Sequence, residues 1–339
     1  MTRMVLLAML AGCAPEVPDR YLVVDGREGV YGLEELAIPE LDDPWRMRGS
    51  LGDGRVGGYI AGDLFGGELR GYTGGAPLRL EYTVRDGTGV PLDEDGVILW
   101  SYYHTLSTFR GELEGVGFDT SGIFPVPFAY QPSLGGTILS SNAAYAGDVI
   151  HLFVLLPDGG GDGLPLAANP GVIRHEFGHA IFQSVIGGGV GVSTPAIALP
   201  EVSALNEGFA DMVATLSLDD PDFITPSIDL AGTRDVTGDH ALPSEDPATN
   251  PYSRGTVYAS FTWDVRRALD DREATLVHVL ATLREWAADA PWELGQPGVD
   301  LFPGLLADRV LADHPELEGT LCAAYDARFP GLIRPSACL

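Results

Sequence analysis

The sequence predicts an α+β fold, with a small β-rich region, then a half that bears a sheet, then a mainly helical half. Three observations predict it. Short β-like runs separated by Gly-rich turns occupy residues 21–90. Residues 123–156 read as further strands, and from about residue 200 onward apolar residues recur at helical spacing. A chain of 339 residues is long enough for two domains or for one large divided domain.

The N-terminus has the features of an export signal. Arg3 gives a short positive region, and residues 5–10 form an apolar core that is too short to span a membrane as a mature helix. Leu10-Ala11-Gly12-Cys13 resembles a bacterial lipobox, in which cleavage before the Cys precedes its lipidation. We expect a signal peptide over residues 1–12, lipid on Cys13, and attachment to the outer membrane or cell surface. The alternatives are a plain secretory signal and an ordinary N-terminus with a chance Cys.

Residues 13–90 are interpreted as a tether followed by the small β-rich region. The tether is short and rich in Pro and acidic residues, and runs such as residues 21–24 read as strands. Nothing in this region indicates a function. A larger domain is expected over residues 91–339, with its sheet-bearing half at 91–186 and its helical half at 187–339.

Residues 95–120 carry apolar and aromatic side chains at helical spacing, which predicts a helix. His104 falls within it and is interpreted as a surface or packing residue. The largely apolar run at residues 149–156 predicts a strand. Later helices are expected at residues 202–217, 254–270, 272–289, 301–312 and 315–328, with Pro291, Pro297 and Pro303 in the connections.

The stretch His175-Glu176-Phe177-Gly178-His179 predicts a metal site. On a helix, residues i and i+4 lie on one face about one turn apart, so the two imidazoles can bind one ion. Glu176 can then lie beside the open coordination position and take a proton from a water there, as in the H-E-x-x-H pattern. A buried pair of structural histidines is the alternative.

The residues around this motif predict the limits of its helix. Asn169 is a good N-cap and Pro170 suits the first turn, while Gly187 is expected just past the C-terminal end. Gly178 is unfavourable inside a helix by about 1 kcal/mol. We therefore expect another backbone, or the third metal ligand, to approach the helix closely at Gly178.

A second segment, Asn206-Glu207-Gly208-Phe209-Ala210-Asp211, predicts the third ligand. A catalytic zinc site needs three protein ligands and one open position, and His2Glu is a standard set, so Glu207 is expected to complete it. Asp211 shares a helix face with Glu207 and is expected to accept the free ring N–H of a ligand histidine. A helix with two solvated acids is the alternative.

Together the two motifs resemble those of gluzincin metallopeptidases of the thermolysin-like and fungalysin-like kind. The resemblance is specific at these two helices and faint over the rest of residues 95–290. It implies a zincin-like catalytic domain with a central zinc helix, Zn2+ as cofactor, and endopeptidase action on a protein or peptide substrate with Glu176 as general base. The rival hypothesis is a non-catalytic surface lipoprotein that uses this fold as a binding or structural module, although a purely structural site has no need of Glu176.

Two further segments match the family more weakly. Around Asn142 and Ala143 the sequence is similar to an edge strand that pairs with the extended substrate, and the resemblance implies this substrate-binding role for both residues. An ordinary turn or strand end is the alternative. Where related peptidases have a His that stabilises the oxyanion, this chain has Tyr252, whose phenol can also donate a hydrogen bond. Tyr258 and His240 are the other candidates for this role.

The charge balance bears on the class of partner. The chain has 48 Asp+Glu against 20 Lys+Arg and a net charge of −28. Nucleic-acid binding is not expected, because phosphate contacts need clustered Lys and Arg. Beyond the N-terminal segment no run is long and apolar enough to span a bilayer, so membrane contact is expected through the N-terminal lipid alone.

Cys322 and Cys338 remain once Cys13 is assigned to lipid. In an oxidising compartment these two can form a disulfide bond that ties down the C-terminus, whereas two free thiols are the alternative. The Gly- and Asp-rich run at residues 158–163 suggests a loop for Ca2+, although it lacks the ligand spacing of an EF-hand and also suits a plain flexible loop.

Overall fold

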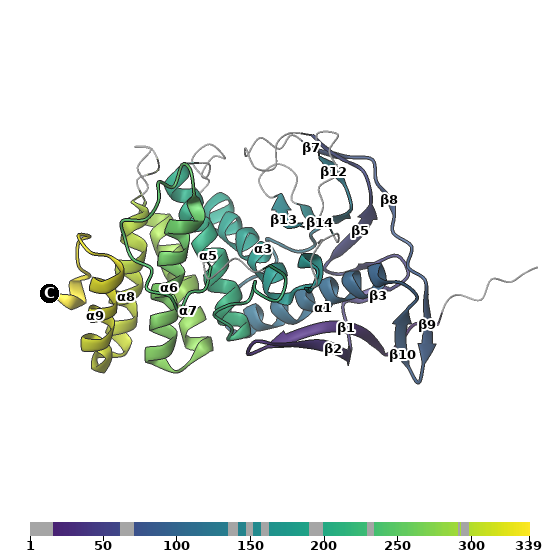
Figure 1. The fold of residues 1–339 in the computed structure, drawn as a ribbon, viewed down its shortest axis with the longest axis horizontal. Helices are drawn as coiled ribbons and strands as arrows, with labels where there is room; N and C mark the ends of the chain where they lie inside the picture. The colour runs from purple at the N-terminus through teal and green to yellow at the C-terminus, as the bar shows by residue number, and fades with distance from the viewer. Residues whose placement is uncertain are drawn as a thin grey trace, which may run out of the picture.

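Strands and helices occupy different parts of the chain (Figure 1). In the computed structural model, strands gather at one end, helices α6 to α9 lie at the other, and α3 and α5 lie between them (Figure 1). The predicted α+β arrangement of a sheet-bearing half, a central motif-bearing helix and a helical half is confirmed. The structure describes residues 16–61, 71–134, 142–146, 152–156, 163–189, 199–228, 234–290, 292 and 298–339.

Some predictions lie outside these residues. They are the signal peptide, the lipidation of Cys13, and the calcium loop at 158–163 except for its last residue, Gly163. In the part of the chain that the structure describes, no helix has the length and apolar character needed to cross a membrane.

A four-stranded sheet packs against the first long helix. In order across the sheet, its strands are β2 (Val30–Leu36), β1 (Arg20–Arg27), β10 (Thr88–Pro91) and β9 (Tyr82–Arg85). α1 (Glu94–Gly115) contacts this sheet through Ser101, whose Oγ accepts a 2.7 Å hydrogen bond from the Val24 N–H. His104 of α1 is buried, which agrees with the packing interpretation and not with a surface position.

A seven-stranded sheet has its edge strand next to the helix that carries the H-E-x-x-H motif. The main path in order is β13 (Asn142–Ala146), β14 (Leu152–Leu156), β11 (Phe128–Tyr130), β5 (Gly52–Val56), β4 (Arg48–Gly49) and β3 (Leu41–Asp43), and β8 (Ala76–Pro77) pairs with β5. Among the described strands, β13 pairs with β14 alone. A smaller sheet contains β12 (Ser133–Leu134), β6 (Tyr59–Ala61) and β7 (Gly71–Thr73).

The predicted division near residue 90 does not coincide with a boundary between sheets. β5 precedes this position and pairs in parallel with β11, with Gly54 opposite Phe128. A Cβ on Gly54 would lie 2.4 Å from the Phe128 ring, so the small residue permits this contact. The N-terminal region therefore contributes four strands to the sheet that ends at β13.

The helical half begins with the motif helix. Its α-helices are α3 (Pro170–Gln183), α5 (Pro200–Leu218), α6 (Pro251–Leu269), α7 (Arg272–Asp289), α8 (Phe302–Asp313) and α9 (Glu318–Arg328). Shorter helical turns are η1 (Leu166–Ala168), η2 (Ser184–Gly189), η4 (Val299–Leu301), η5 (Pro315–Leu317) and η6 (Ser336–Cys338). The prediction of a helix over 272–289 is confirmed without change, whereas α6 starts earlier than predicted because Asn250 caps it by accepting from the Ser253 N–H.

The start of α3 is as predicted and its end is not. Asn169 Oδ1 accepts a 2.8 Å hydrogen bond from the Gly171 N–H, as an N-cap should. Gly187 does not stop the helix, since the chain continues as the π-helical turn η2. That turn places the side chain of Ile186 in the core, where it is fully buried.

Glycines set the close packing of α3, α5 and α6. A Cβ on Gly178 of α3 would lie 2.7 Å from the Ala210 Cα of α5, which is the close backbone approach that the sequence predicts. On the other side of α5, a Cβ on Gly208 would lie 2.6 Å from the carbonyl oxygen of Gly255 of α6. The three helices can therefore hold their side chains in one compact cluster.

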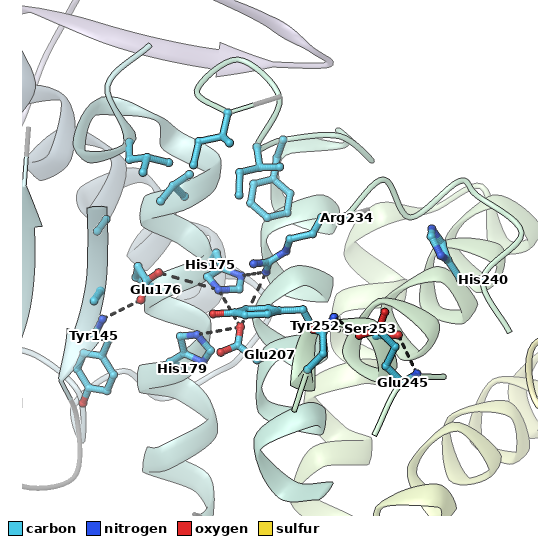
Figure 2. A pocket seen from close by; sticks show the side chains of 18 residues that line it. Tyr145, His175, Glu176, His179, Glu207, Arg234, His240, Glu245, Tyr252 and Ser253 are labelled. Carbon is cyan, nitrogen blue, oxygen red and sulfur yellow. Dashed lines mark hydrogen bonds and ion pairs between the residues drawn. The ribbon is translucent and has the colours of Figure 1, made fainter. Parts of the chain in front are cut away.

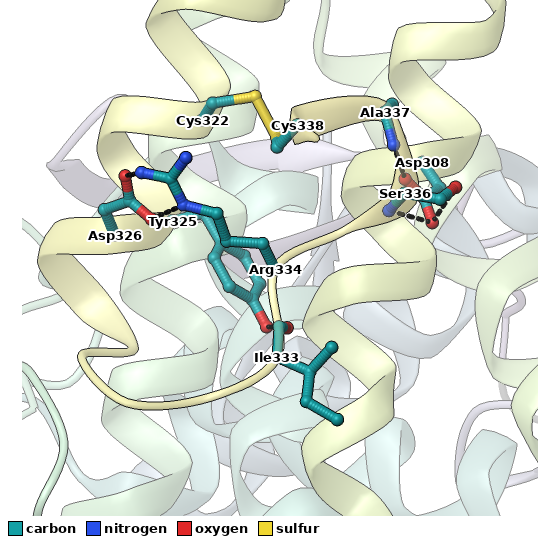
Figure 3. Close-up of a disulfide and its surroundings, with 9 residues drawn as sticks. All are labelled: Asp308, Cys322, Tyr325, Asp326, Ile333, Arg334, Ser336, Ala337 and Cys338. Atoms are coloured by element: carbon teal, nitrogen blue, oxygen red, sulfur yellow. Dashed lines mark hydrogen bonds and ion pairs between the residues drawn. A yellow bond between two sulfur atoms is a disulfide. The ribbon is translucent and has the colours of Figure 1, made fainter.

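The C-terminus is tied to the last helix. Cys322 on α9 and Cys338 on η6 form a disulfide bond across 16 residues (Figure 3). Next to it, Asp308 on α8 accepts hydrogen bonds from the backbone N–H groups of Ser336 and Ala337. α8, α9 and the chain end thus form one unit.

Candidate metal centre and active site

Three side chains from α3 and α5 converge on one point (Figure 2). His175 and His179 come from α3 and Glu207 comes from α5, and one ligand atom of each lies within 4.8 Å of the other two. The Glu207 Oε2 is 3.5 Å from His175 Nε2 and 3.8 Å from His179 Nε2. Within the described ranges, this is the one group of three or more such side chains that could hold a metal ion.

The Nδ1 atom of each ring has a carbonyl or carboxylate partner. His179 Nδ1 lies 2.9 Å from Asn206 Oδ1, and His175 Nδ1 lies 2.9 Å from Asp211 Oδ1. Because these oxygens only accept, each Nδ1 carries a proton, and Nε2 is the ring nitrogen that lies on the Glu207 side. Arg234 also lies 3.3 Å from His175 Nδ1, but a guanidinium can only donate, so the shorter contact to Asp211 decides the tautomer.

The donor set fits a metal ion. Glu207 Oε2 is buried and has no hydrogen-bond partner, which is costly unless a ligand satisfies it. Burial raises the pKa of Glu207, but the nearby charges of His179, His175 and Arg234 lower it more, so the carboxylate stays ionised. Two imidazole Nε2 atoms and one carboxylate oxygen form a standard three-ligand set for Zn2+.

Glu176 lies beside this cluster on the side of the edge strand. Its Oε2 accepts a 2.7 Å hydrogen bond from the Tyr145 N–H of β13, and its Oε1 lies 4.0 Å from His175 Nε2 (Figure 2). Burial raises the pKa of Glu176, which makes its carboxylate a stronger base. The sequence predicts that Glu176 lies near the expected metal site, and the structure adds the backbone donor that orients its carboxylate.

Arg234 is a component of the site that the sequence analysis missed. Its guanidinium pairs with Asp211, lies 3.9 Å from Glu207 Oε2, and stands 4.7 Å from the ring centre of Tyr252. It comes from an irregular segment, where no periodicity marks a buried residue. Asn206 belongs to the same motif as Glu207, but the sequence analysis assigned it no function. A polar residue next to Glu207 in an apolar helix could have indicated its contact with His179.

Tyr252, in the first turn of α6, points its phenol toward the cluster (Figure 2). The negative charge of Glu207, followed by burial, raises the pKa of Tyr252 to about 12, so its hydroxyl stays protonated and can donate. Tyr258 does not line this pocket, since its hydroxyl donates to Asp300 at 2.8 Å. His240 lies at the pocket wall with Nε2 2.8 Å from the Asp235 carbonyl oxygen, away from the cluster.

The cluster opens into a cavity of about 660 Å3. One part of the wall is apolar and another part is polar. The apolar residues are Leu166, Val172, Phe223, Ile224 and Ile228, and the polar ones include His240, Glu245, Asn250 and Ser253. β13 supplies Ala143, Ala144 and Tyr145 to the cavity, while for Asn142 the structure describes the backbone position on β13 alone.

Comparison with solved structures gives distant likenesses, and one of them is described here. The chain is similar to a solved structure described as the precursor of protealysin, a metalloproteinase from Serratia proteamaculans, with 12% sequence identity and a TM-score of 0.47. The match covers 80% of this chain and 85% of that chain. No protein-family model and no curated protein matches the chain. A likeness at this level carries no argument about activity, which must come from the side chains described above.

Proposed function

We propose that the protein is a zinc-dependent peptidase that hydrolyses peptide bonds in protein or peptide substrates as an endopeptidase. One observation carries the proposal. The Nε2 atoms of His175 and His179 and the carboxylate of Glu207 converge at the floor of a cavity, with the carboxylate of Glu176 beside them. A site that served structure alone would need no buried base next to its ligands.

The metal would be held by His175, His179 and Glu207. When bound, Zn2+ supplies Lewis acidity, which acidifies water and polarises a scissile carbonyl. Asp211 and Asn206 hold the two imidazoles in the tautomer that leaves Nε2 free. Arg234 neutralises part of the negative charge of Asp211 and Glu207.

Proton transfer would fall to Glu176. As a water oxygen attacks the carbonyl carbon, the Glu176 carboxylate accepts the proton from that water. It then passes the proton to the amide nitrogen as the C–N bond breaks, so that the product amine leaves neutral. The Tyr145 N–H fixes the carboxylate through both steps.

Tyr252 and β13 would serve the substrate. The protonated phenol of Tyr252, which points toward the cluster, would donate to the oxygen that becomes negative during attack. The edge of β13, with Asn142 and Ala143, would add an extended peptide as a further strand through main-chain hydrogen bonds.

The test measures zinc content and cleavage of a quenched-fluorescent peptide library by wild type and by Glu176→Gln. We expect zinc in both proteins and cleavage by wild type alone. Full activity in Glu176→Gln, or a wild-type protein that binds no zinc, would contradict the mechanism. Zinc in both and cleavage by neither would favour the rival function of a non-catalytic binding module.

We also propose that the chain is exported and anchored by lipid on Cys13, which rests on the sequence at residues 10–13. Metabolic labelling with a fatty-acid analogue should label wild type and not Cys13→Ser. Equal labelling of both proteins would contradict the lipid anchor, and a plain secretory signal would then remain.

A further inference from the structure

The segment from Arg234 to Asn250 forms one wall of the active-site cavity. It contributes Arg234, His240, Glu245 and Asn250 to the lining. Across residues 234–250 the structure contains turns and bends but no helix or strand, so no regular hydrogen-bond ladder holds this wall. Its position must come from individual contacts.

The wall is also thinly supported from behind. A second cavity of about 650 Å3 lies on its other side and is lined by Thr237, Asp239 and His240 of the segment together with α6 and α9. His240 borders both cavities. Val236 and Leu242 pack into the core at either end of this stretch, so polar contacts gain importance between them, where open space lies on two sides.

Arg328 supplies several of these contacts. This buried residue ends α9, and its Nη1 donates to the carbonyl oxygens of Gly238 and His240, the latter at 3.0 Å. Its Nε donates to Asp264 Oδ2 on α6 at 2.9 Å, and its own carbonyl oxygen accepts from the Leu242 N–H at 2.8 Å. One side chain thus joins the segment to both α6 and α9.

We propose that Arg328 is a positioning residue of the active site, which holds the middle of the 234–250 wall so that its two ends reach the cluster correctly. One end is Arg234, which pairs with Asp211. The other end is the Asn250 cap, after which α6 begins and presents Tyr252. The inference rests on the proposed peptidase function for its catalytic consequence, but not for the attachment itself.

A matched pair of variants separates positioning from general stability. Arg328→Met removes the clamp. Arg266→Met is the control, because Arg266 also lies on the helical half, is similarly buried, and makes a two-point contact with Asp219 at 3.1 and 3.0 Å, away from the wall. If Arg328→Met does not fold, Arg328→Lys keeps the charge and can reach one carbonyl oxygen but cannot keep all contacts.

Two measurements are made on the full-length zinc-loaded proteins. In hydrogen exchange, Arg328→Met should speed exchange of peptides spanning residues 236–242 by about tenfold or more, while Arg266→Met leaves them unchanged. With a peptide selected from the library by wild type, kcat/KM should fall roughly 10- to 100-fold in Arg328→Met at unchanged zinc content, with Arg328→Lys between the two.

Each outcome decides the proposal. Faster exchange and lower kcat/KM confined to the Arg328 variants support it. Equal effects of Arg328→Met and Arg266→Met on both readouts, or unchanged exchange at residues 236–242, overturn it. If wild type cleaves no peptide, the peptidase function fails while the exchange comparison still shows whether Arg328 holds the wall.

Discussion

The Tyr145 N–H donates a 2.7 Å hydrogen bond to Glu176 Oε2. The donor belongs to the backbone of the edge strand β13, so the strand that would receive the substrate also orients the proposed base. The position of the base is therefore coupled to the position of the edge strand, and not to the chemistry of a neighbouring side chain.

Removing this backbone donor should impair catalysis more than removing the phenol of the same residue. Tyr145→Pro deletes the N–H, and we expect kcat to fall about 10- to 100-fold because the buried carboxylate loses its orientation. Tyr145→Phe keeps the N–H and should stay within about twofold of wild type. Steady-state kinetics at matched zinc content make the comparison, and equal losses in both variants would argue against a backbone role.

The Asn206 side chain should strengthen metal binding although it does not reach the metal position. Asn206→Ala removes the acceptor of the His179 Nδ1–H, and the affinity for Zn2+ should fall about 10- to 100-fold. Competition with a fluorescent chelator measures the change. Ser203→Ala on the same helix is the control, and a similar affinity in the two variants would contradict this role.

The hydroxyl of Tyr252 should act during the reaction and not in substrate binding. Tyr252→Phe keeps the ring that stacks on Arg234 but removes the donor, so kcat should fall about 100-fold with little change in KM. Tyr258→Phe is a matched control on the same helix, because its hydroxyl contacts Asp300 outside the cavity. An unchanged kcat in Tyr252→Phe would leave the oxyanion without this donor and redirect attention to Arg234.

Two glycine substitutions should have opposite effects on stability. Gly178→Ala places a Cβ 2.7 Å from the Ala210 Cα and should destabilise the fold by about 1–3 kcal/mol. Gly111→Ala on α1 meets open space and should stabilise by about 0.5–1 kcal/mol, as alanine normally does within a helix. Thermal denaturation measures both, and two changes of the same sign would show that the approach of α3 to α5 is not tight.

The parts of the site that the sequence reveals are those set by local helix geometry. His175 and His179, and likewise Glu207 and Asp211, are four residues apart, so a helix alone places each pair on one face. Arg234 could not be found in this way, because it enters the site from an irregular segment. The Tyr145 donor also escaped, since a backbone group carries no sequence signal.

The same distinction applies to the fold. The limits of α7 and the N-cap Asn169 follow from nearby residues, and both predictions are correct. The pairing of β5 with β11 joins segments more than 70 residues apart in the sequence, since Gly54 lies opposite Phe128. Such a pairing leaves no local pattern, which is why the division near residue 90 was placed between strands of one sheet.

The position of β5 in the sheet has a practical consequence for protein production. β5 lies between β11 and β4, so a fragment that starts at residue 91 would expose the N–H and C=O groups along one side of β11. Unpaired strand edges promote association between chains. Shortened versions intended for crystallisation or assay should therefore retain everything from β1 onward, so that β5 keeps its place beside β11.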